Sequence, residues 1–396
     1  MNRIAAVTGI GCVTVAGVGA GQTWEALLRG QVLGQLHPAE GQMPQHWTAR
    51  APESAALEGL LFGLSYPRPS RTTILSMTAA QECWQNAGAD GQIDHDRAGC
   101  AMSRNFGQHE VVGRYLRVLW EKGPASVSGL QFVQTISNTV LGKVSLDFHL
   151  RGPSILNLGA PVLGLALDTL RDDDADVMLV GGIDELSLYT LTRVCLGGIA
   201  ALSDETFGPY DARRHGLLPG EGAAFLLLEK PEFAKARGAK VLGYLCGYAS
   251  VADRSKNSFN RNEDDIGESI RRALEDSDVA AEDIALVCGA GTRLPNFDCA
   301  ELQALEKVFP TPPVLFSCKG ALGETWGASA YLSAISVLKA FSTGLAPPTA
   351  GTTELESGCR VPIIVERPAP VCQDIALVLS LDMSGQNSAY VFVSKP

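Results

Sequence analysis

A strand, a tight turn and a helix follow one another in the segment RGPSILNLGAPVLGLALDTL, residues 151–170. Residues 154–158 predict a β-strand, Gly-Ala-Pro predicts the turn, and an apolar helix is expected from Val162 onward. Several enzyme classes mount a nucleophile at such an elbow, where the helix dipole favours an anion. The residue at this apex is Pro161, which suits a helix start but carries no nucleophilic atom. The segment therefore predicts a catalytic elbow without its nucleophile.

Cysteine and histidine are the other residue types that could carry such chemistry. The ten cysteines occur singly, with no Cys-x-x-Cys pair and no zinc-like spacing. This pattern predicts reduced, buried thiols, no metal site and no cofactor. All six histidines lie before residue 216, so the C-terminal part of the chain has none.

Composition excludes several classes of partner. The 396 residues are 46% hydrophobic, enough for a large α/β core, and the net charge of −11 argues against binding nucleic acid. No apolar run reaches the roughly 18 residues of a membrane span. The start, MNRIAAVTGIGCV, lacks a signal-peptide cleavage pattern. We expect a cytoplasmic protein with neither a nucleic-acid nor a membrane partner.

Strand-like apolar runs alternate with amphipathic helices along the whole chain. Strands are expected at Arg3–Thr8, Asp176–Gly181, Ala223–Leu228, Ile284–Cys288, Val314–Ser317 and Ile375–Ser380, the last pairing with AYVFVSK. Helices are expected at Thr23–Arg29, Ser76–Ala87, Val112–Lys122, Val162–Arg171, Ile266–Asp276, Ala300–Val308 and Ala328–Phe341. KARGAKVLGYLCGYAS opens a new strand as NRIAAVTGIGCVT does, which predicts two similar halves, 1–240 and 241–396.

Several blocks, in order, resemble the β-ketoacyl synthase family. They are VTGIGCVTVAGVGAGQTWEALLRGQ, ADVMLVGGIDELS, PYDARRHGLLPGEGAAFLLLEKPEFAKARGAKV, GAGTRLPNFDCAELQALEKVF and FSCKGALGETWGASAYLSAISVL. The resemblance covers nearly the whole chain. It implies the α/β thiolase fold, in which two pseudo-repeated halves form two five-stranded sheets with helices outside and between, in five αβαβα layers. It also implies a dimer.

The resemblance implies a demanding reaction for active members, the decarboxylative Claisen condensation of acyl units. A cysteine at the elbow carries the acyl chain. Two histidines stabilise the enolate and oxyanion formed when malonyl carrier protein loses CO₂, and a lysine supports them. This chemistry needs an activated nucleophile and hydrogen-bond donors aimed at developing negative charge.

Carried over position by position, the catalytic groups are missing. Pro161 stands at the cysteine position. In the HGTGTP-type motif the histidine position falls on Cys288, and in the KSxxGHxxGA-type motif it falls on Glu324, while Lys319 is retained. We expect Glu324 to form a buried ion pair with Lys319, the alternative being a solvated loop glutamate. Cys288 follows a strand and is expected to be a buried, inert thiol.

Chain-length factors of type II polyketide synthases share the missing cysteine, and RYLRVLWEKGPASVS and GLLPGEGAA resemble their segments. The resemblance implies a subunit without activity of its own, paired with an active ketosynthase that also provides most of the docking for acyl carrier protein. His109, Val112 and Leu116 form one helical face that would limit the acyl tunnel, the alternative being ordinary packing. In the C-terminal loop LDMSGQN, Met383 takes the place of a gating phenylalanine.

Two other classes of function stay open. One is a homodimeric acyl transferase or hydrolase with relocated catalytic groups, for which an acyl adduct on Cys288 would be evidence. The other is a homodimeric binding or scaffold protein with no synthase partner. The product also stays open, among an aromatic polyketide, an aryl polyene and another polyene.

Overall fold

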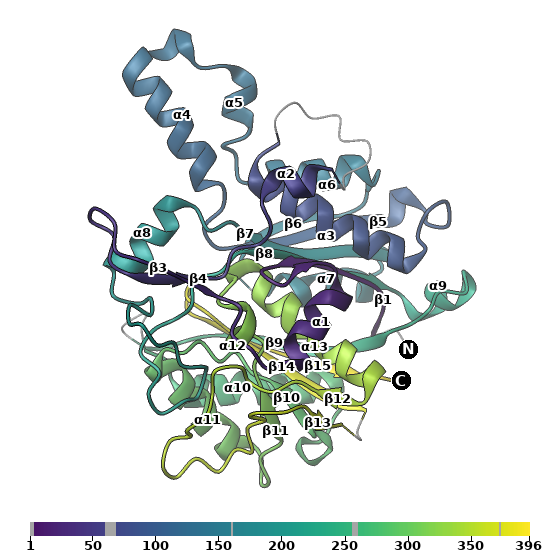
Figure 1. Ribbon diagram of the computed structural model, residues 1–396. Helices are drawn as coiled ribbons and strands as arrows, with labels where there is room; N and C mark the ends of the chain where they lie inside the picture. The colour runs from purple at the N-terminus through teal and green to yellow at the C-terminus, as the bar shows by residue number, and fades with distance from the viewer. Residues whose placement is uncertain (1–3, 60–68, 160, 256–259, 372–373) are drawn as a thin grey trace.

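Two five-stranded sheets, hydrogen-bonded to each other as one continuous path of strands, form the centre of the molecule (Figure 1). The computed structural model describes residues 4–59, 69–159, 161–255, 260–371 and 374–396. The N-terminal sheet has the order β6 (Ser154–Leu158), β5 (Ala98–Arg104), β7 (Val177–Asp184), β8 (Gly222–Glu229) and β1 (Ala5–Thr14). The C-terminal sheet has the order β11 (Val314–Phe316), β10 (Leu286–Cys288), β14 (Ile375–Asp382), β15 (Gln386–Val393) and β9 (Gly243–Ala252). Pairing of β1 with β9 joins the two sheets.

The two sheets repeat one strand pattern. In the first, β5 is parallel to β6 and β7, β7 is antiparallel to β8, and β8 is antiparallel to β1. In the second, β10 is parallel to β11 and β14, β14 is antiparallel to β15, and β15 is antiparallel to β9. The pseudo-repeat and the thiolase fold are thereby confirmed, whereas the division between residues 240 and 241 stays a prediction.

Helices lie in three layers around the sheets. Between the sheets, α7 (Val162–Arg171) and α13 (Ser329–Thr343) share one apolar core with both sheets. Outside the N-terminal sheet, α3 (Arg71–Ala87) and α6 (Thr139–Asp147) form a second core. Outside the C-terminal sheet, α10 (Glu263–Ser277) and α11 (Pro295–Val308) form a third. The result is the five-layered arrangement.

Shorter elements surround these layers. The helices among them are α1 (Ala20–Leu28), α2 (Ser54–Glu58), α4 (His109–Lys122), α5 (Gly129–Val133), α8 (Leu188–Leu196), α9 (Pro231–Ala236) and α12 (Lys319–Leu322), with the 3₁₀ turns η1 (His95–Arg97), η2 (Pro124–Ser126), η3 (Ala281–Asp283) and η4 (Trp326–Ala328). The strands are β2 (Gly17–Val18), β3 (Gln35–His37), β4 (His46–Thr48), β12 (Leu345–Ala346) and β13 (Ala369–Pro370). In Figure 1, α4 and α5 project away from the body of the molecule.

The expected elements are present, most of them with shifted ends, whereas α7 has the expected bounds. The first strand runs to Thr14 because all ten of its residues are buried, and Arg3 lies outside the described residues. Strand β5 was not expected, because apolar and polar residues do not alternate in AGCAMSR. The strand is buried on both faces, so its sequence needs no such alternation.

Three absences apply to the part of the chain that the structure describes. No helix there is long and apolar enough to cross a bilayer. No group of three or more potential ligands there is placed to hold a metal ion. The nine described cysteines are free, and Cys372 lies outside the described residues.

Candidate functional site

The elbow expected from the sequence is present between β6 and α7. Gly159 has φ 75°, a left-handed conformation that favours glycine, and its N–H donates to the Arg104 carbonyl at 3.3 Å. Ala160 lies outside the described residues. Pro161 is buried, has φ −64°, and its carbonyl accepts from the Leu165 N–H at 2.9 Å, which starts the helix. The side chain at the apex is therefore a saturated pyrrolidine ring, which has no group that could attack a thioester.

A buried ion pair lies in the retained lysine motif. Lys319 and Glu324 are 5% and 7% exposed, and Lys319 Nζ lies 2.6 Å from Glu324 Oε2. Burial works to lower the pKa of Lys319, but the charge and hydrogen bond of Glu324 outweigh it, so that pKa is raised. The expected pairing is therefore present. The Lys319 ammonium is therefore held by Glu324, which lies just after the end of α12.

The second carboxylate oxygen of Glu324 holds the chain that follows it. Glu324 Oε1 accepts from the Trp326 N–H at 2.8 Å and from the Ser329 hydroxyl at 2.7 Å. Together with the lysine, these donors satisfy the carboxylate with internal partners. Neither Trp326 nor Ser329 was expected from the sequence, because both stand outside the motif's defining positions.

Cys288 is fully buried at the end of β10 and belongs to the central core. Burial raises the pKa of its thiol well above the usual value, and Cys318 and Ser333 are its side-chain neighbours. A buried thiol of raised pKa is a poor nucleophile. The expectation of a buried residue is confirmed.

The loop after β10 allows a second placement of the first histidine motif. Setting Ala290 at the histidine position matches Gly291, Thr292 and Pro295 to the Gly, Thr and Pro of HGTGTP. Glu301 accepts the backbone N–H groups of Ala290 at 2.6 Å and of Gly291 at 3.0 Å, and fixes the loop. Burial raises the pKa of Glu301 to about 7. Neither placement provides an imidazole.

The histidines of the chain are all engaged elsewhere. Their contacts are His37 stacked on His46 at 5.3 Å, His95 edge-on to His149 at 5.9 Å, His109 Nδ1 at 3.3 Å from Thr190 Oγ1, and His215 Nε2 at 2.6 Å from Ser203 Oγ. None of these residues belongs to the elements that carry Lys319 and Glu324. The site therefore contains a lysine and a carboxylate but no imidazole.

The residues expected to limit a tunnel lie on α4, which begins at His109. His109 and Val112 are half-buried, whereas Leu116 is 51% exposed and Trp120 is 91% exposed. Glu185 accepts the Glu110 N–H at 3.2 Å at the base of this helix, and burial raises the pKa of Glu185 to about 7. Leu116 thus has little packing within its own chain, so ordinary core packing does not explain it.

Met383 lies in the turn between β14 and β15 and packs on a small apolar cluster with Phe106 and Trp326. A Cβ on Gly159 would approach the Asp382 side chain to 2.8 Å, which places this turn against the elbow. Asp382, the residue before Met383, therefore lies beside the elbow, whereas the gate assignment of Met383 stays a prediction.

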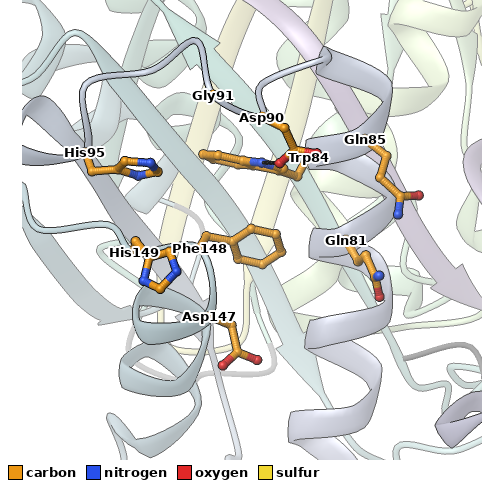
Figure 2. Close-up of a pocket in the computed structure, with 9 residues that line it drawn as sticks. All are labelled: Gln81, Trp84, Gln85, Asp90, Gly91, His95, Asp147, Phe148 and His149. Carbon is orange, nitrogen blue, oxygen red and sulfur yellow. Dashed lines mark hydrogen bonds between the residues drawn. The ribbon is translucent and has the colours of Figure 1, made fainter. Parts of the chain in front are cut away.

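A surface cavity of about 360 Å³ lies apart from the elbow, the Lys319–Glu324 pair and α4 (Figure 2). It is lined by Gln81, Trp84, Gln85, Asp90, Gly91, His95, Asp147, Phe148 and His149. His95 in η1 directly precedes β5, so the cavity lies at the amino end of that strand. The elbow lies at the carboxyl end of β6, which runs parallel to β5, and therefore at the opposite end of these strands. It shares no residue with the candidate site.

Known proteins match the chain over its full length. Models of the β-ketoacyl synthase N-terminal and C-terminal domains match residues 1–234 and 242–353. The actinorhodin polyketide putative β-ketoacyl synthase 2 of Streptomyces coelicolor is 29% identical over 405 residues, 97% of each chain. The tetracenomycin polyketide synthase ketoacyl synthase β subunit of Streptomyces glaucescens is 29% identical over 403 residues, again 97% of each chain.

A solved structure adds evidence for the fold. The ishigamide ketosynthase/chain length factor superposes with a TM-score of 0.89 at 23% identity, and the match covers 100% of both chains. Two family models that together match most of the chain, and a fold shared over its whole length, establish the relationship. The chain belongs to the β-ketoacyl synthase family.

Proposed function

We propose that this chain is a non-catalytic chain-length factor, which pairs with an active ketosynthase and shapes the acyl tunnel during polyketide or polyene extension. The observation that carries the proposal is the combination of Pro161 at the elbow with the buried Lys319–Glu324 ion pair at 2.6 Å. It fits relatives of the same length, one of which is described as a ketoacyl synthase β subunit.

This chain alone lacks the two things that condensation requires, which are a nucleophile and hydrogen-bond donors for the developing negative charge. Without a nucleophile at residue 161 no acyl-enzyme forms. A carboxylate at residue 324 would oppose the negative charge of an enolate, and each missing oxyanion donor typically costs about 10²–10³ in rate. Restoring one group would leave the other deficits in place.

The surface supports an obligate partner. Strand β6 ends its sheet, and Leu158 on it is 55% exposed. Trp120 on α4 and Leu130 on α5 are 91% and 72% exposed, and Leu188 on α8 is 61% exposed. Exposed apolar side chains on β6, α4, α5 and α8 support a protein interface on this half of the molecule. We assign this surface to an active ketosynthase of the same family. The elbow cysteine of that partner would carry the growing acyl chain. The partner would also make most of the contact with acyl carrier protein.

Incubation of the purified chain with malonyl carrier protein and an acyl primer tests the catalytic part. We expect no CO₂ release from the wild type, from Pro161→Cys or from the control Pro161→Ala, and release once an active ketosynthase is co-purified with the chain. Turnover by the pure chain, or an acyl adduct on Cys288, would instead support the homodimeric enzyme with relocated groups. A stable homodimer that ignores the synthase would support a scaffold protein.

A further inference from the structure

The surface cavity of Figure 2 is formed by two segments that are distant along the chain. Residues 81–95 contribute the end of α3, the turn after it and the start of η1, and residues 147–149 contribute the end of α6. The cavity volume of about 360 Å³ is that of a pocket for a small molecule. Gln85, Asp90 and His149 in its lining are exposed, so a ligand can enter it from solvent.

Two aromatic rings form the apolar part of this cavity. The Trp84 and Phe148 rings lie with their centroids 5.1 Å apart and their planes at 41°. Trp84 is only 4% exposed and is held in the core outside the N-terminal sheet, whereas Phe148 is half-buried against that core. Aromatic faces carry partial negative charge and attract cations. The rings thus offer a fixed surface to an apolar or a cationic group.

Two carboxylates lie on opposite sides of the rings. Figure 2 shows Asp90 above and Asp147 below them. The Trp84 indole N–H donates to Asp90 Oδ1 at 2.7 Å, which fixes this carboxylate beside the ring. Asp147 already interacts electrostatically with the buried Lys143. Asp90 is therefore the carboxylate that a ligand in the cavity meets with its charge less compensated.

The remaining side chains of the lining are amides and imidazoles. Gln81 and Gln85 lie on α3, and the His95 and His149 rings pack edge-on at 5.9 Å. Amide oxygens and imidazole nitrogens can accept hydrogen bonds from an ammonium group. None of the nine lining residues is a lysine or an arginine, and no set of metal ligands is assembled within the described chain. The lining therefore favours an organic cation over an anion or a metal ion.

We infer that this cavity binds a small organic cation, a protonated amine that carries an apolar group. The ammonium group donates to the Asp90 carboxylate, and the apolar group packs on the Phe148 and Trp84 rings. An anion of the same shape meets the carboxylates and the negative ring faces and is rejected. The cavity lies at the opposite end of β5 and β6 from the elbow, so the inference does not depend on the proposed function.

Calorimetric titration of the purified full chain, alone or co-purified with a ketosynthase, tests this inference. The probes are three molecules of nearly one shape, the cation 2-phenylethylammonium, the neutral 2-phenylethanol and the anion phenylacetate. Asp90→Asn removes the charge and keeps an acceptor for the Trp84 N–H, and Phe148→Leu removes the half-buried ring. Asp94→Asn is the matched control, because Asp94 is an exposed carboxylate of the same loop that does not line the cavity.

We expect the cation to bind the wild type with a Kd of about 1 mM, and the alcohol to bind at least about tenfold more weakly. Asp90→Asn should weaken cation binding about tenfold and Phe148→Leu about threefold, with Asp94→Asn unchanged. The cation should also raise the unfolding midpoint of the wild type and of the control more than that of the two site variants.

Three outcomes would overturn the inference and leave the proposed function standing. They are no binding of the cation at about ten times the expected Kd, equal binding of all three probes, and cation binding that Asp90→Asn leaves unchanged. Unfolding midpoints measured without a probe show whether each variant is folded. If Phe148→Leu is not, Asp90→Asn decides the matter, because it preserves the hydrogen bond to Trp84.

Discussion

The outer edge strands of the two halves, β6 and β11, hold equivalent places and differ in what covers them. On β11, Leu315 N donates to the Pro362 carbonyl at 2.9 Å, and Ile364 N donates to the Leu315 carbonyl at 2.8 Å. No segment of the described chain pairs with the outer edge of β6 in this way. An unpaired edge bearing exposed leucine is a template for association.

The helices that follow β5 and β10, the equivalent inner strands of the two halves, also differ in how much of their surface is buried. Helix α11 follows β10 and buries Phe297, Leu302 and Leu305 in its own half. Helix α4 follows β5, and Val111 is its one fully buried residue. The C-terminal half is therefore completed by its own chain, whereas the N-terminal half leaves an edge strand and the helix α4 largely uncovered. We assign this uncovered surface to the proposed synthase partner.

The largest expected effect comes from a charge on the open edge. Leu158→Asp should weaken the heterodimer at least about 100-fold, because an unpaired carboxylate in an apolar interface costs several kcal/mol. Val314→Asp on β11 is the matched control, since Val314 is 37% exposed on the covered counterpart strand. Co-purification and gel filtration with the synthase measure the effect. Equal weakening by both variants would contradict the comparison.

Breaking the ion pair should destabilise the covered half. Glu324→Ala leaves Lys319 buried without its carboxylate and should cost about 3–5 kcal/mol of unfolding free energy. The double variant Lys319→Met, Glu324→Leu should recover most of that loss, because neither charge then remains. Denaturant titration measures both. Additive losses in the double variant would show that the pair is not the source of the cost.

Helix α4 should set product length without affecting stability. Leu116→Ala removes roughly three methylene-sized groups, worth about 0.8 kcal/mol each in apolar contact, and should admit at least one further extension unit. Val112→Phe should shorten the product, since packed surfaces resist extra volume at about 1–3 kcal/mol. The product mass distribution of the reconstituted pair is the measurement. If both changes leave it unaltered in an intact complex, α4 does not limit the chain.

The smallest effect is a pH dependence shared by the two halves. Burial raises the pKa of Glu185 and of Glu301 to about 7, so each favours folding below the usual glutamate pKa and loses that contribution as pH rises through about 7. Glu185→Gln or Glu301→Gln should each flatten the fall in unfolding free energy between pH 5 and 7 by at most about 1.4 kcal/mol per pH unit. Denaturation at several pH values checks this. If the variants leave the slope of unfolding free energy against pH unchanged, groups other than Glu185 and Glu301 cause the pH dependence.

Local pattern was sufficient for much of the fold and for the losses at the site. The helix Val162–Arg171 was placed with its observed bounds, because a Gly-Ala-Pro turn precedes a continuous apolar run. The missing groups were evident from residue type alone, since proline cannot attack and carboxylate cannot replace imidazole. Strand β5 was not foreseen, because burial on both faces leaves it no alternation of apolar and polar residues. Helix α8 was missed although Leu191, Val194 and Cys195 recur at helical spacing.

The sequence by itself determined which residue types stand at the elbow and in the two motifs, because Pro161, Cys288 and Glu324 are matters of residue identity. Only the tertiary structure decided how these residues and their neighbours are arranged. The 2.6 Å approach of Lys319 to Glu324, the hold of that carboxylate on Trp326, and the exposure of β6 all depend on segments distant along the chain. Such arrangements follow from packing and shared hydrogen bonds, which leave no period in the sequence.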